Sequence, residues 1–216
     1  MNRREVNATL LAGAALAAVP VAARAQGVKA LPAPRKEIGK PLMQALQSRR
    51  SIREFSPRPL PPQVLSELLW AAYGVNRPSG DRTAPYGRHI MVIDVYAAMA
   101  DGVWLYDPKQ HALRPHLDSD IRAMTGLQDF VATAPLDLVY VAHGERMKDI
   151  TPEERRLYGS VDAALAGQNV YLYCASEGLA TVFRGALDHD KLNRAMRLEN
   201  GPFVTFAQTV GYPAAS

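Results

Sequence analysis

The spacing of apolar residues predicts several helices along this chain. A short stripe at 42–46 ends before a proline-rich turn, and a second stripe recurs at steps of three and four from Pro62 to Gly74. Proline lacks the N–H donor and clashes with the preceding turn, so it separates these two helices. The longest helix is expected from Thr151 to Glu177, because a capping hydroxyl, a proline and two acids stand at its start and Gly178 follows its end.

Runs rich in β-branched and aromatic residues predict strands between and after these helices. Ile90 to Ala98 reads as a buried strand, and Asp101-Gly102 is a turn into 103–106, which makes an antiparallel hairpin. The remaining predicted strands are 111–113, 136–142, 180–186 and 203–210, and further helices are predicted at 118–134 and 188–197. We therefore expect an α+β fold, a mixed and largely antiparallel sheet flanked by helices, with one long central helix.

Composition and charge fit one domain without a nucleic-acid-binding surface. The 216 residues are 48% hydrophobic, which is enough for a substantial core. Beyond residue 25 the chain holds 22 basic and 20 acidic residues, because 3 of its 25 basic and 1 of its 21 acidic residues come earlier. This near balance argues against a groove for nucleic acid, which needs a concentrated basic face.

Cysteine and histidine content argues against two kinds of site. Cys174 is the only cysteine, so no internal disulfide and no multi-cysteine metal site can form. It lies on a ridge of small residues with Ala163, Gly167 and Val170, which allows another helix to approach closely, and we expect it to serve packing. His111, His116, His143 and His189 show no metal-ligand spacing, and we expect no metal centre.

The first 25 residues have the pattern of an export signal. Arg3-Arg4 precede a nearly continuous run of small and apolar residues from Ala8 to Ala23, and Ala23-Arg24-Ala25 follows as a cleavage pattern. The run is about 16 residues long, shorter than the ~20 that span a bilayer, so we expect no stable membrane span. We therefore expect residues 1–25 to be a signal peptide and the protein to be exported to the periplasm.

The Arg3-Arg4 pair bears on the route of export, and residues 26–39 bear on where the domain begins. The adjacent arginines resemble a twin-arginine signal, whose route carries proteins already folded around a cofactor. Ordinary Sec export stays open, because Val6 and Asn7 stand where that signal usually has Phe and Leu. Residues 26–39 read as an extended linker or N-terminal arm, and the domain is expected to span residues 40–216.

The most informative stretch is residues 48–55, which we call the arginine turn. Arg49, Arg50 and Arg53 stand there with two serines, directly after the first helix. Guanidinium groups are permanently charged and present a planar fork of donors, so clustered Arg with Ser suits a phosphate-bearing ligand. The alternative is a solvated basic turn that merely ends the helix. The polar loop at 76–89 is long enough to suggest a binding role as well.

Four ordered motifs resemble the flavin-dependent nitroreductase family. The motifs are Arg49–Phe55, Arg82–Pro85, Asp162–Gly178 with Arg184-Gly185, and Thr209–Pro213. The resemblance covers nearly all of residues 40–213, and the ordered set is far more specific than the arginine signature alone. It implies a homodimer with long core helices at the interface and one FMN per subunit in a cleft between the subunits.

The resemblance also implies how FMN is held. Arg49 and Ser51 would bind the phosphate, with a further contact from Arg50. Arg53 would reach the ribityl chain and the N1/C2 carbonyl edge, where a positive group stabilises the anionic reduced flavin. These roles agree with the chemistry of the residue types, since a phosphate needs guanidinium forks and hydroxyl donors.

On the ring side, the resemblance implies roles for two further segments. The backbone N–H of Gly185 would lie near flavin N5 or O4, where a side chain would obstruct the ring. Arg184 precedes it and would contact the cofactor or line the substrate side. Pro85 and His89 are expected to contact the flavin, and Tyr86 to stack on substrate or on the ring. A purely structural role for His89 stays open.

The chain departs from the family pattern in the loop after the second helix. Relatives commonly have Ser, Asn and Gln where Tyr86, His89 and Met91 stand here, so small polar flavin contacts are replaced by larger groups. Many also carry a Lys or Arg beyond the final strand, and none is present up to Ser216. A protein that keeps the fold but has lost flavin is therefore an alternative.

The expected function is that of an exported FMN-dependent oxidoreductase. It would take electrons from NAD(P)H or an unidentified redox partner and pass two electrons or a hydride to a small electron-poor acceptor, such as a nitroaromatic or a quinone. No catalytic acid or nucleophile is assigned, because no Ser–His–acid or paired-carboxylate arrangement is evident. The alternatives are a flavin-less binding or structural protein and a flavin dehydrogenase acting on a modified peptide or metabolite.

Overall fold

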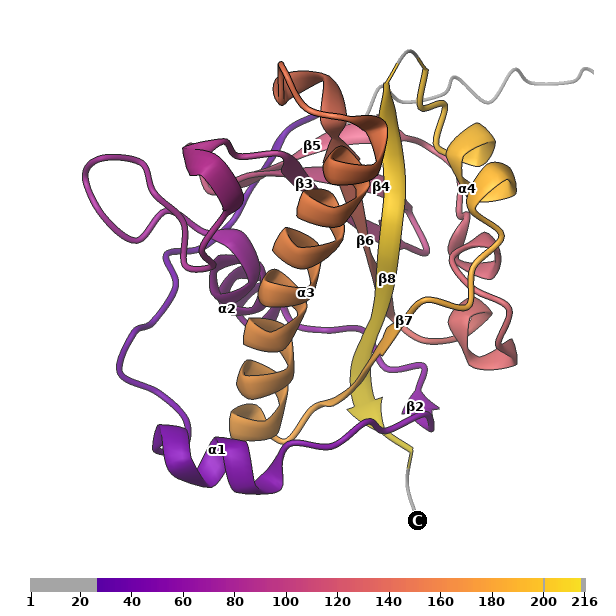
Figure 1. Cartoon of the computed structure of the whole chain (residues 1–216). Helices are drawn as coiled ribbons and strands as arrows, with labels where there is room; N and C mark the ends of the chain where they lie inside the picture. The colour runs from indigo at the N-terminus through magenta and orange to yellow at the C-terminus, as the bar shows by residue number, and fades with distance from the viewer. Residues whose placement is uncertain (1–26, 200, 215–216) are drawn as a thin grey trace, which may run out of the picture.

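The fold is an antiparallel sheet with helices packed on both faces (Figure 1). The computed structural model describes residues 27–199 and 201–214, so the predicted signal peptide at 1–25 lies outside the described residues. The strand order is β1-β5-β4-β3-β6-β8-β2, and β7 pairs with β8. The strands are β1 Lys29–Ala30, β2 Phe55–Ser56, β3 Ile93–Met99, β4 Gly102–Asp107, β5 Ala112–Leu117, β6 Leu136–His143, β7 Ala180–Arg184 and β8 Pro202–Pro213.

The predicted α+β class is confirmed. Every strand pair in the described part of the chain is antiparallel, which sharpens the expectation of a mixed, largely antiparallel sheet. The last strand runs beyond its predicted end at 210, because Phe55 and Ser56 of β2 pair with Pro213 and Tyr212. Pairing with a distant segment therefore sets where β8 ends.

Alternation along the strands gives the sheet two buried faces. Ile93 and Val95 of β3 pack in a core with α2 and α3, whereas Tyr96 and Ala98 pack in a second core with α4. Successive strand residues point to opposite faces, so a strand covered on both sides is apolar nearly throughout. The helices are α1 Leu42–Ser48, α2 Pro62–Tyr73, α3 Pro152–Glu177 and α4 His189–Ala195.

The long helix α3 begins and ends where the sequence predicts. The Thr151 hydroxyl accepts the Glu154 N–H at 3.2 Å, and the Thr151 N–H donates to the Glu154 carboxylate at 2.9 Å, which forms a capping box. Gly178 closes the helix with a φ of 71°. A Cβ on Gly167 would lie 2.5 Å from the Phe183 ring, so this glycine lets the sheet approach closely, while Ala163, Val170 and Cys174 of the same ridge share a core with α2.

Residues 118–134 do not form the predicted helix. They make two 3₁₀ turns, η2 Arg122–Met124 and η3 Asp129–Ala132. Between the turns, the Thr125 carbonyl accepts a hydrogen bond from the Arg184 guanidinium at 2.7 Å, and a Cβ on Gly126 would lie 1.8 Å from that guanidinium. The hydrogen-bonding needs of a buried cation thus override the local helical pattern.

The segment before α1 is packed on the domain. Ser66 of α2 donates to the Pro32 carbonyl at 2.5 Å, and Arg35 pairs with Glu67 at 2.6 Å. Lys29 and Ala30 add β1 to the edge of the sheet beside β5. Among the helices of the described residues, none combines the length and the apolar character needed to cross a bilayer.

Candidate active site

The arginine turn leaves α1 and is held against β7 and β8. The chain departs from helical geometry at Arg49, whose ψ is 124°. The N–H of Ile52 donates to the Thr181 carbonyl of β7 at 3.0 Å, and Phe55-Ser56 then pair with the end of β8. The turn is therefore fixed on both sides, next to the strand that leads to Gly185.

The arginines of this turn have no counter-charges among the described residues. Arg53 makes no hydrogen bond or ion pair within that part of the chain, and Arg50 only reaches the Ser48 carbonyl, at 3.4 Å. The Arg49 guanidinium lies over the Tyr171 ring, 5.3 Å from its centroid. Three uncompensated positive charges this close together attract a dianion such as phosphate.

A tyrosine that sequence analysis missed connects the turn to β7. The Tyr171 hydroxyl of α3 lies 2.7 Å from Ser51 Oγ and accepts the Phe183 N–H at 2.9 Å. Its sequence signal was its position four residues after Gly167, which places both on one side of α3. Ser51 itself is exposed, so its hydroxyl is open to a ligand.

At its far end, β7 leads to an exposed glycine. A Cβ on Gly185 would lie 3.3 Å from the Phe206 ring, so a side chain would crowd this surface. Phe206 and Phe183 are half-buried, and their ring centroids lie 4.8 Å apart. An open glycine backbone beside aromatic side chains suits the approach of a flat ring system. The arginine turn and Gly185, both predicted cofactor contacts, thus lie along one strand.

The Arg184 side chain does not line this surface, so the structure gives no support to its predicted contact with cofactor or substrate. The side chain is 4% exposed and donates to Asp137 at 2.9 Å and to the Thr125 carbonyl at 2.7 Å. Its Nε also donates to Thr209 Oγ1 at 3.1 Å. Successive residues of a strand point to opposite faces, so Phe183 and the following arginine cannot both face α3. Burial raises the pKa of Asp137, and the Arg184 charge opposes that shift.

The three loop residues predicted to contact flavin or substrate lie elsewhere in the subunit. Pro85 and His89 are exposed, and the Tyr86 hydroxyl donates to Asp81 within the same loop. In Figure 1 the loop 76–89 lies on the other side of α3 from the arginine turn. A single chain therefore does not bring these residues to the arginine turn.

A buried carboxylate anchors that loop to α3. Asp162 is 1% exposed and accepts the Gly87 N–H at 3.0 Å. Burial raises its pKa to about 6, although the Gly87 hydrogen bond favours the ionised form. The buried Tyr73 hydroxyl finds no partner among the described residues, and its pKa is raised by burial first and by the Asp162 charge second. The loop is thus held by a carboxylate that titrates near pH 6.

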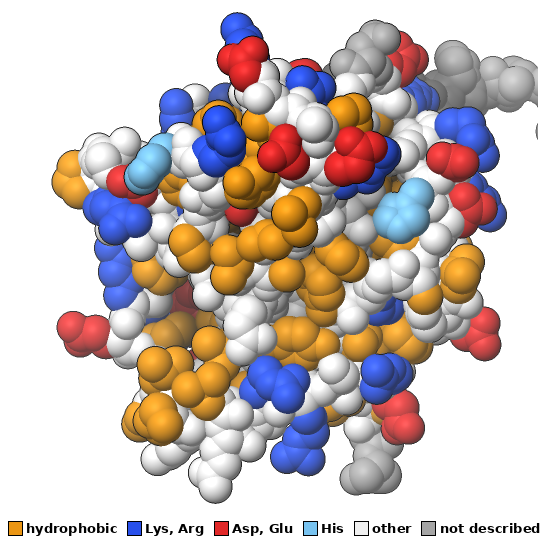
Figure 2. Space-filling view, in the orientation of Figure 1, with side chains coloured by type: hydrophobic (Ala, Val, Ile, Leu, Met, Phe, Trp, Pro, Cys, Tyr) orange, Lys and Arg blue, Asp and Glu red, His pale blue; other side chains and the backbone are white. Residues whose placement is uncertain are grey.

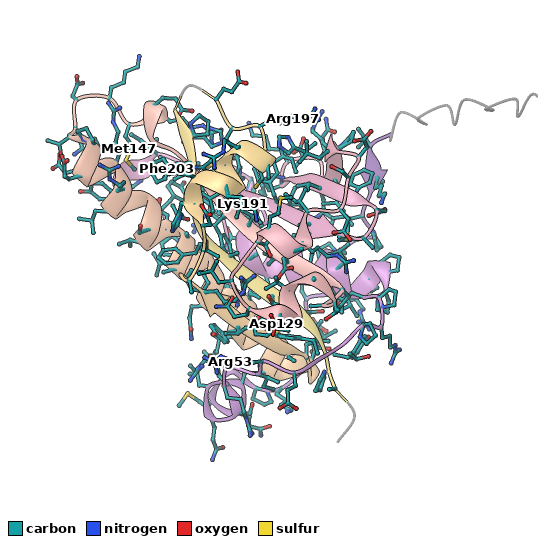
Figure 3. All side chains as sticks on the ribbon, turned by 90° about the vertical axis from the view of Figure 1, so that its right-hand side faces the viewer. Arg53, Asp129, Met147, Lys191, Arg197 and Phe203 are labelled. Atoms are coloured by element: carbon teal, nitrogen blue, oxygen red, sulfur yellow. The ribbon has the colours of Figure 1, made fainter. Side chains whose placement is uncertain are left out.

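A cavity of about 430 Å³ adjoins Phe206, between α3, α4 and β8. Its polar lining is Arg156 and Ser160 of α3, His189, Asp190 and Asn193 of α4, and Thr205 of β8. The Val204 backbone orients two of them, since His189 Nδ1 donates to its carbonyl at 3.1 Å and Asn193 Oδ1 accepts its N–H at 2.9 Å. The Asn193 amide N–H groups and the Ser160 hydroxyl have no partner among the described residues, so they are free to donate to the oxygen atoms of a ligand. In Figure 3, Phe203 of the cavity lining lies near the top of the view, and Arg53 of the arginine turn lies near the bottom.

Comparisons with known proteins agree with this architecture. The family model described as the Nitroreductase family matches residues 46–212. A curated protein of Methanocaldococcus jannaschii that carries a nitroreductase name is 31% identical over 173 residues, 76% of this chain and 87% of that protein. The crystal structure of a nitroreductase from Ralstonia eutropha JMP134 is 45% identical with a TM-score of 0.85, over 89% of this chain and 92% of that chain.

A more distant solved structure shares the fold alone. The NADPH:FMN oxidoreductase of Vibrio harveyi, solved with NAD+, has a TM-score of 0.58 at 20% identity, over 81% of this chain and 69% of that chain. The family match extends from the end of α1 to the end of β8 and so includes both the arginine turn's charged residues and Gly185. The chain belongs to the nitroreductase family of oxidoreductases.

Proposed function

We propose that this protein binds FMN and passes two electrons or a hydride from a reduced donor to a small electron-poor acceptor, such as a nitroaromatic or a quinone. The observation that carries the proposal is the unpaired arginine turn, fixed along β7 beside the exposed backbone of Gly185. Guanidinium groups and a hydroxyl suit a phosphate, and an unobstructed glycine suits a flat ring. Membership of the nitroreductase family supports the same chemistry.

The types of residue on this face suit the separate parts of FMN. Arg49, Arg50 and Ser51 would hold the phosphate, and the unpaired charge of Arg53 would stabilise negative charge at the pyrimidine edge of the ring. Gly185 leaves room for the ring to lie against the backbone. When bound, FMN supplies the two-electron chemistry, and the protein supplies binding, orientation and charge stabilisation.

The cavity beside Phe206 is the proposed acceptor site. Phe203 and Phe206 offer an apolar surface for a flat molecule, while Asn193 and Ser160 offer free donors for its oxygen atoms. The electron donor is proposed to be NAD(P)H or a redox partner protein, the former because the Vibrio harveyi relative is an NADPH:FMN oxidoreductase.

The proposed assembly is a homodimer in which the second copy completes the site. Exposed apolar side chains on α3 and α1 form a surface that Figure 2 shows in orange. They are Leu157, Val161 and Leu165 of α3 with Leu42, Met43 and Leu46 of α1. A second copy on this surface would bury them and bring its own loop 76–89, with Pro85, Tyr86 and His89, towards the arginine turn.

Export through residues 1–25 remains part of the proposal. The adjacent Arg3-Arg4 pair motivates the twin-arginine route. Replacing both arginines with lysine should leave the protein in the cytoplasm if that route is used, whereas Sec export should continue, and fractionation with immunoblotting separates the two.

The visible spectrum of the purified full chain tests the proposed function. We expect flavin bands, or their appearance on addition of FMN, and turnover of a nitroaromatic or menadione with NADPH or dithionite as the reductant. A colourless protein that takes up no FMN would reject the redox function and favour the flavin-less alternative, which Tyr86, His89 and Met91 motivate.

A further inference from the structure

We propose that Tyr171 is a positioning residue that makes this site select a phosphorylated flavin. It would do so by holding the Ser51 hydroxyl with its proton directed towards the ligand. The inference rests on the proposed FMN function and deepens it, because it states which group distinguishes FMN from riboflavin, the same molecule without its phosphate.

The direction of the Tyr171 hydrogen bonds follows from its neighbours. The Phe183 N–H donates to the Tyr171 hydroxyl oxygen at 2.9 Å, and an amide N–H can only donate. The tyrosine proton then needs an acceptor, and Ser51 Oγ, at 2.7 Å, is the only one that the described residues offer. We therefore assign Tyr171 as the donor to Ser51, because the opposite direction would leave the tyrosine proton without an acceptor among those residues. With this assignment the Ser51 proton is available to a ligand.

A serine held in this way is a pre-organised phosphate donor. Ser51 is exposed and has no other hydrogen-bond partner among the described residues, so its O–H is available to a ligand in solvent. Arg49, packed over the Tyr171 ring, provides a guanidinium next to that hydroxyl. Accepting charge-assisted hydrogen bonds from fixed donors favours a phosphate dianion over a neutral hydroxyl.

The same tyrosine fixes the distance between the two ends of the site. Its oxygen joins the arginine turn to Phe183, and Gly185 follows two residues later at the end of β7. The Ile52 N–H bond to the Thr181 carbonyl, at 3.0 Å, reinforces this connection. The phosphate end and the ring end are therefore held in register by one side chain of α3.

The Tyr171→Phe substitution isolates the hydroxyl, because phenylalanine keeps the ring on which Arg49 packs. We would titrate the full chain with FMN and with riboflavin and follow flavin fluorescence. FMN affinity should fall roughly tenfold, as expected for a misplaced charge-assisted donor, while riboflavin affinity should stay within about twofold. Tyr173→Phe is the matched control, since that hydroxyl on the same helix bonds to Glu67 instead, and it should change neither affinity.

A double-mutant cycle with Ser51→Ala tests whether Tyr171 acts through the serine. In the Ser51→Ala background, Tyr171→Phe should cause no further loss of FMN affinity. Equal losses for FMN and riboflavin, or additive losses in the double variant, would overturn the positioning role while leaving the proposed function intact. A wild-type chain that binds neither flavin would instead overturn the proposed function, and this inference with it.

Discussion

Two groups of arginines lie close to β7, and they have opposite surroundings. Arg184 at the end of the strand is buried and donates to Asp137, Thr125 and Thr209. Arg49 and Arg53 in the arginine turn beside it are without any carboxylate partner among the described residues. A guanidinium whose donors are all satisfied internally serves the fold, whereas one left unpaired at the surface is available to a ligand. The buried arginine of β7 therefore stabilises the fold, and the arginines of the turn next to β7 are available to bind a ligand.

The largest expected effect is the loss of stability on breaking the buried ion pair of Arg184 with Asp137. Arg184→Ala leaves the Asp137 carboxylate buried without its counter-charge, which should lower the free energy of unfolding by about 3–5 kcal/mol in urea denaturation. Arg53→Ala should change stability by no more than about 0.5 kcal/mol, because its side chain is exposed and unpaired. Similar losses for the two variants would remove the distinction between structural and ligand-binding arginines.

For FMN affinity, in contrast to stability, substitution in the arginine turn should have a large effect. Arg49→Ala should weaken FMN binding by roughly 10- to 100-fold, since it removes a charge-assisted contact to the phosphate. Arg58→Ala is the matched control, because Arg58 is exposed nearby but packs over Tyr212 instead of Tyr171. Isothermal titration calorimetry measures both variants, and an equal loss in the control would mean that only general positive charge matters.

A second buried carboxylate sharpens the comparison, because it has no guanidinium partner. Burial raises the Asp162 pKa from an ordinary 3.8 to about 6. The unfolded chain therefore ionises first, so stability should fall as pH rises from about 4 to 6 and stay lower above that. Asp162→Asn should remove this penalty and raise stability at pH 7 by about 1–3 kcal/mol, with a flatter profile in pH-dependent thermal unfolding. Reduced stability at pH 7 would show that the ionised Asp162–Gly87 contact outweighs burial.

The smallest expected effect is that of salt concentration, which should change FMN affinity at the arginine turn but not the stability contributed by Arg184. Raising NaCl from 50 mM to 500 mM should weaken FMN binding by roughly three- to tenfold, because the charges of the arginine turn are exposed and screened. The stability difference between wild type and Arg184→Ala should change little, because that pair is shielded from ions. Salt-independent FMN affinity would argue that the phosphate lies away from the arginine turn.

The sequence was a good guide wherever local chemistry decides the structure. The capping hydroxyl of Thr151 and the terminal Gly178 bounded α3 correctly, since both act within one helical turn. The predicted binding role of the arginine turn stays a prediction, and Arg49 and Arg53 have no carboxylate partner among the described residues. The prediction of a helix at 118–134 was wrong. The Thr125 carbonyl in this segment accepts a hydrogen bond from Arg184, which lies far along the chain, so local sequence does not reveal the contact.

The site was harder to predict, because it depends on which face each residue takes. Gly185 and Arg184 are neighbours, yet only the glycine is exposed, and a shift of one position along a strand reverses the face. Tyr171 has only a weak signal in the sequence, its spacing from Gly167, and its contacts become visible only when α3, the arginine turn and β7 are brought together. The roles of Pro85, Tyr86 and His89 stay predictions, since they depend on a second copy of the chain.

A crystal structure of the full chain grown with FMN tests the central claim most directly. The account predicts the phosphate within hydrogen-bond distance of Ser51 and Arg49, and the ring against the backbone of Gly185. FMN bound with its phosphate away from the arginine turn, or an empty site at saturating FMN, would contradict it.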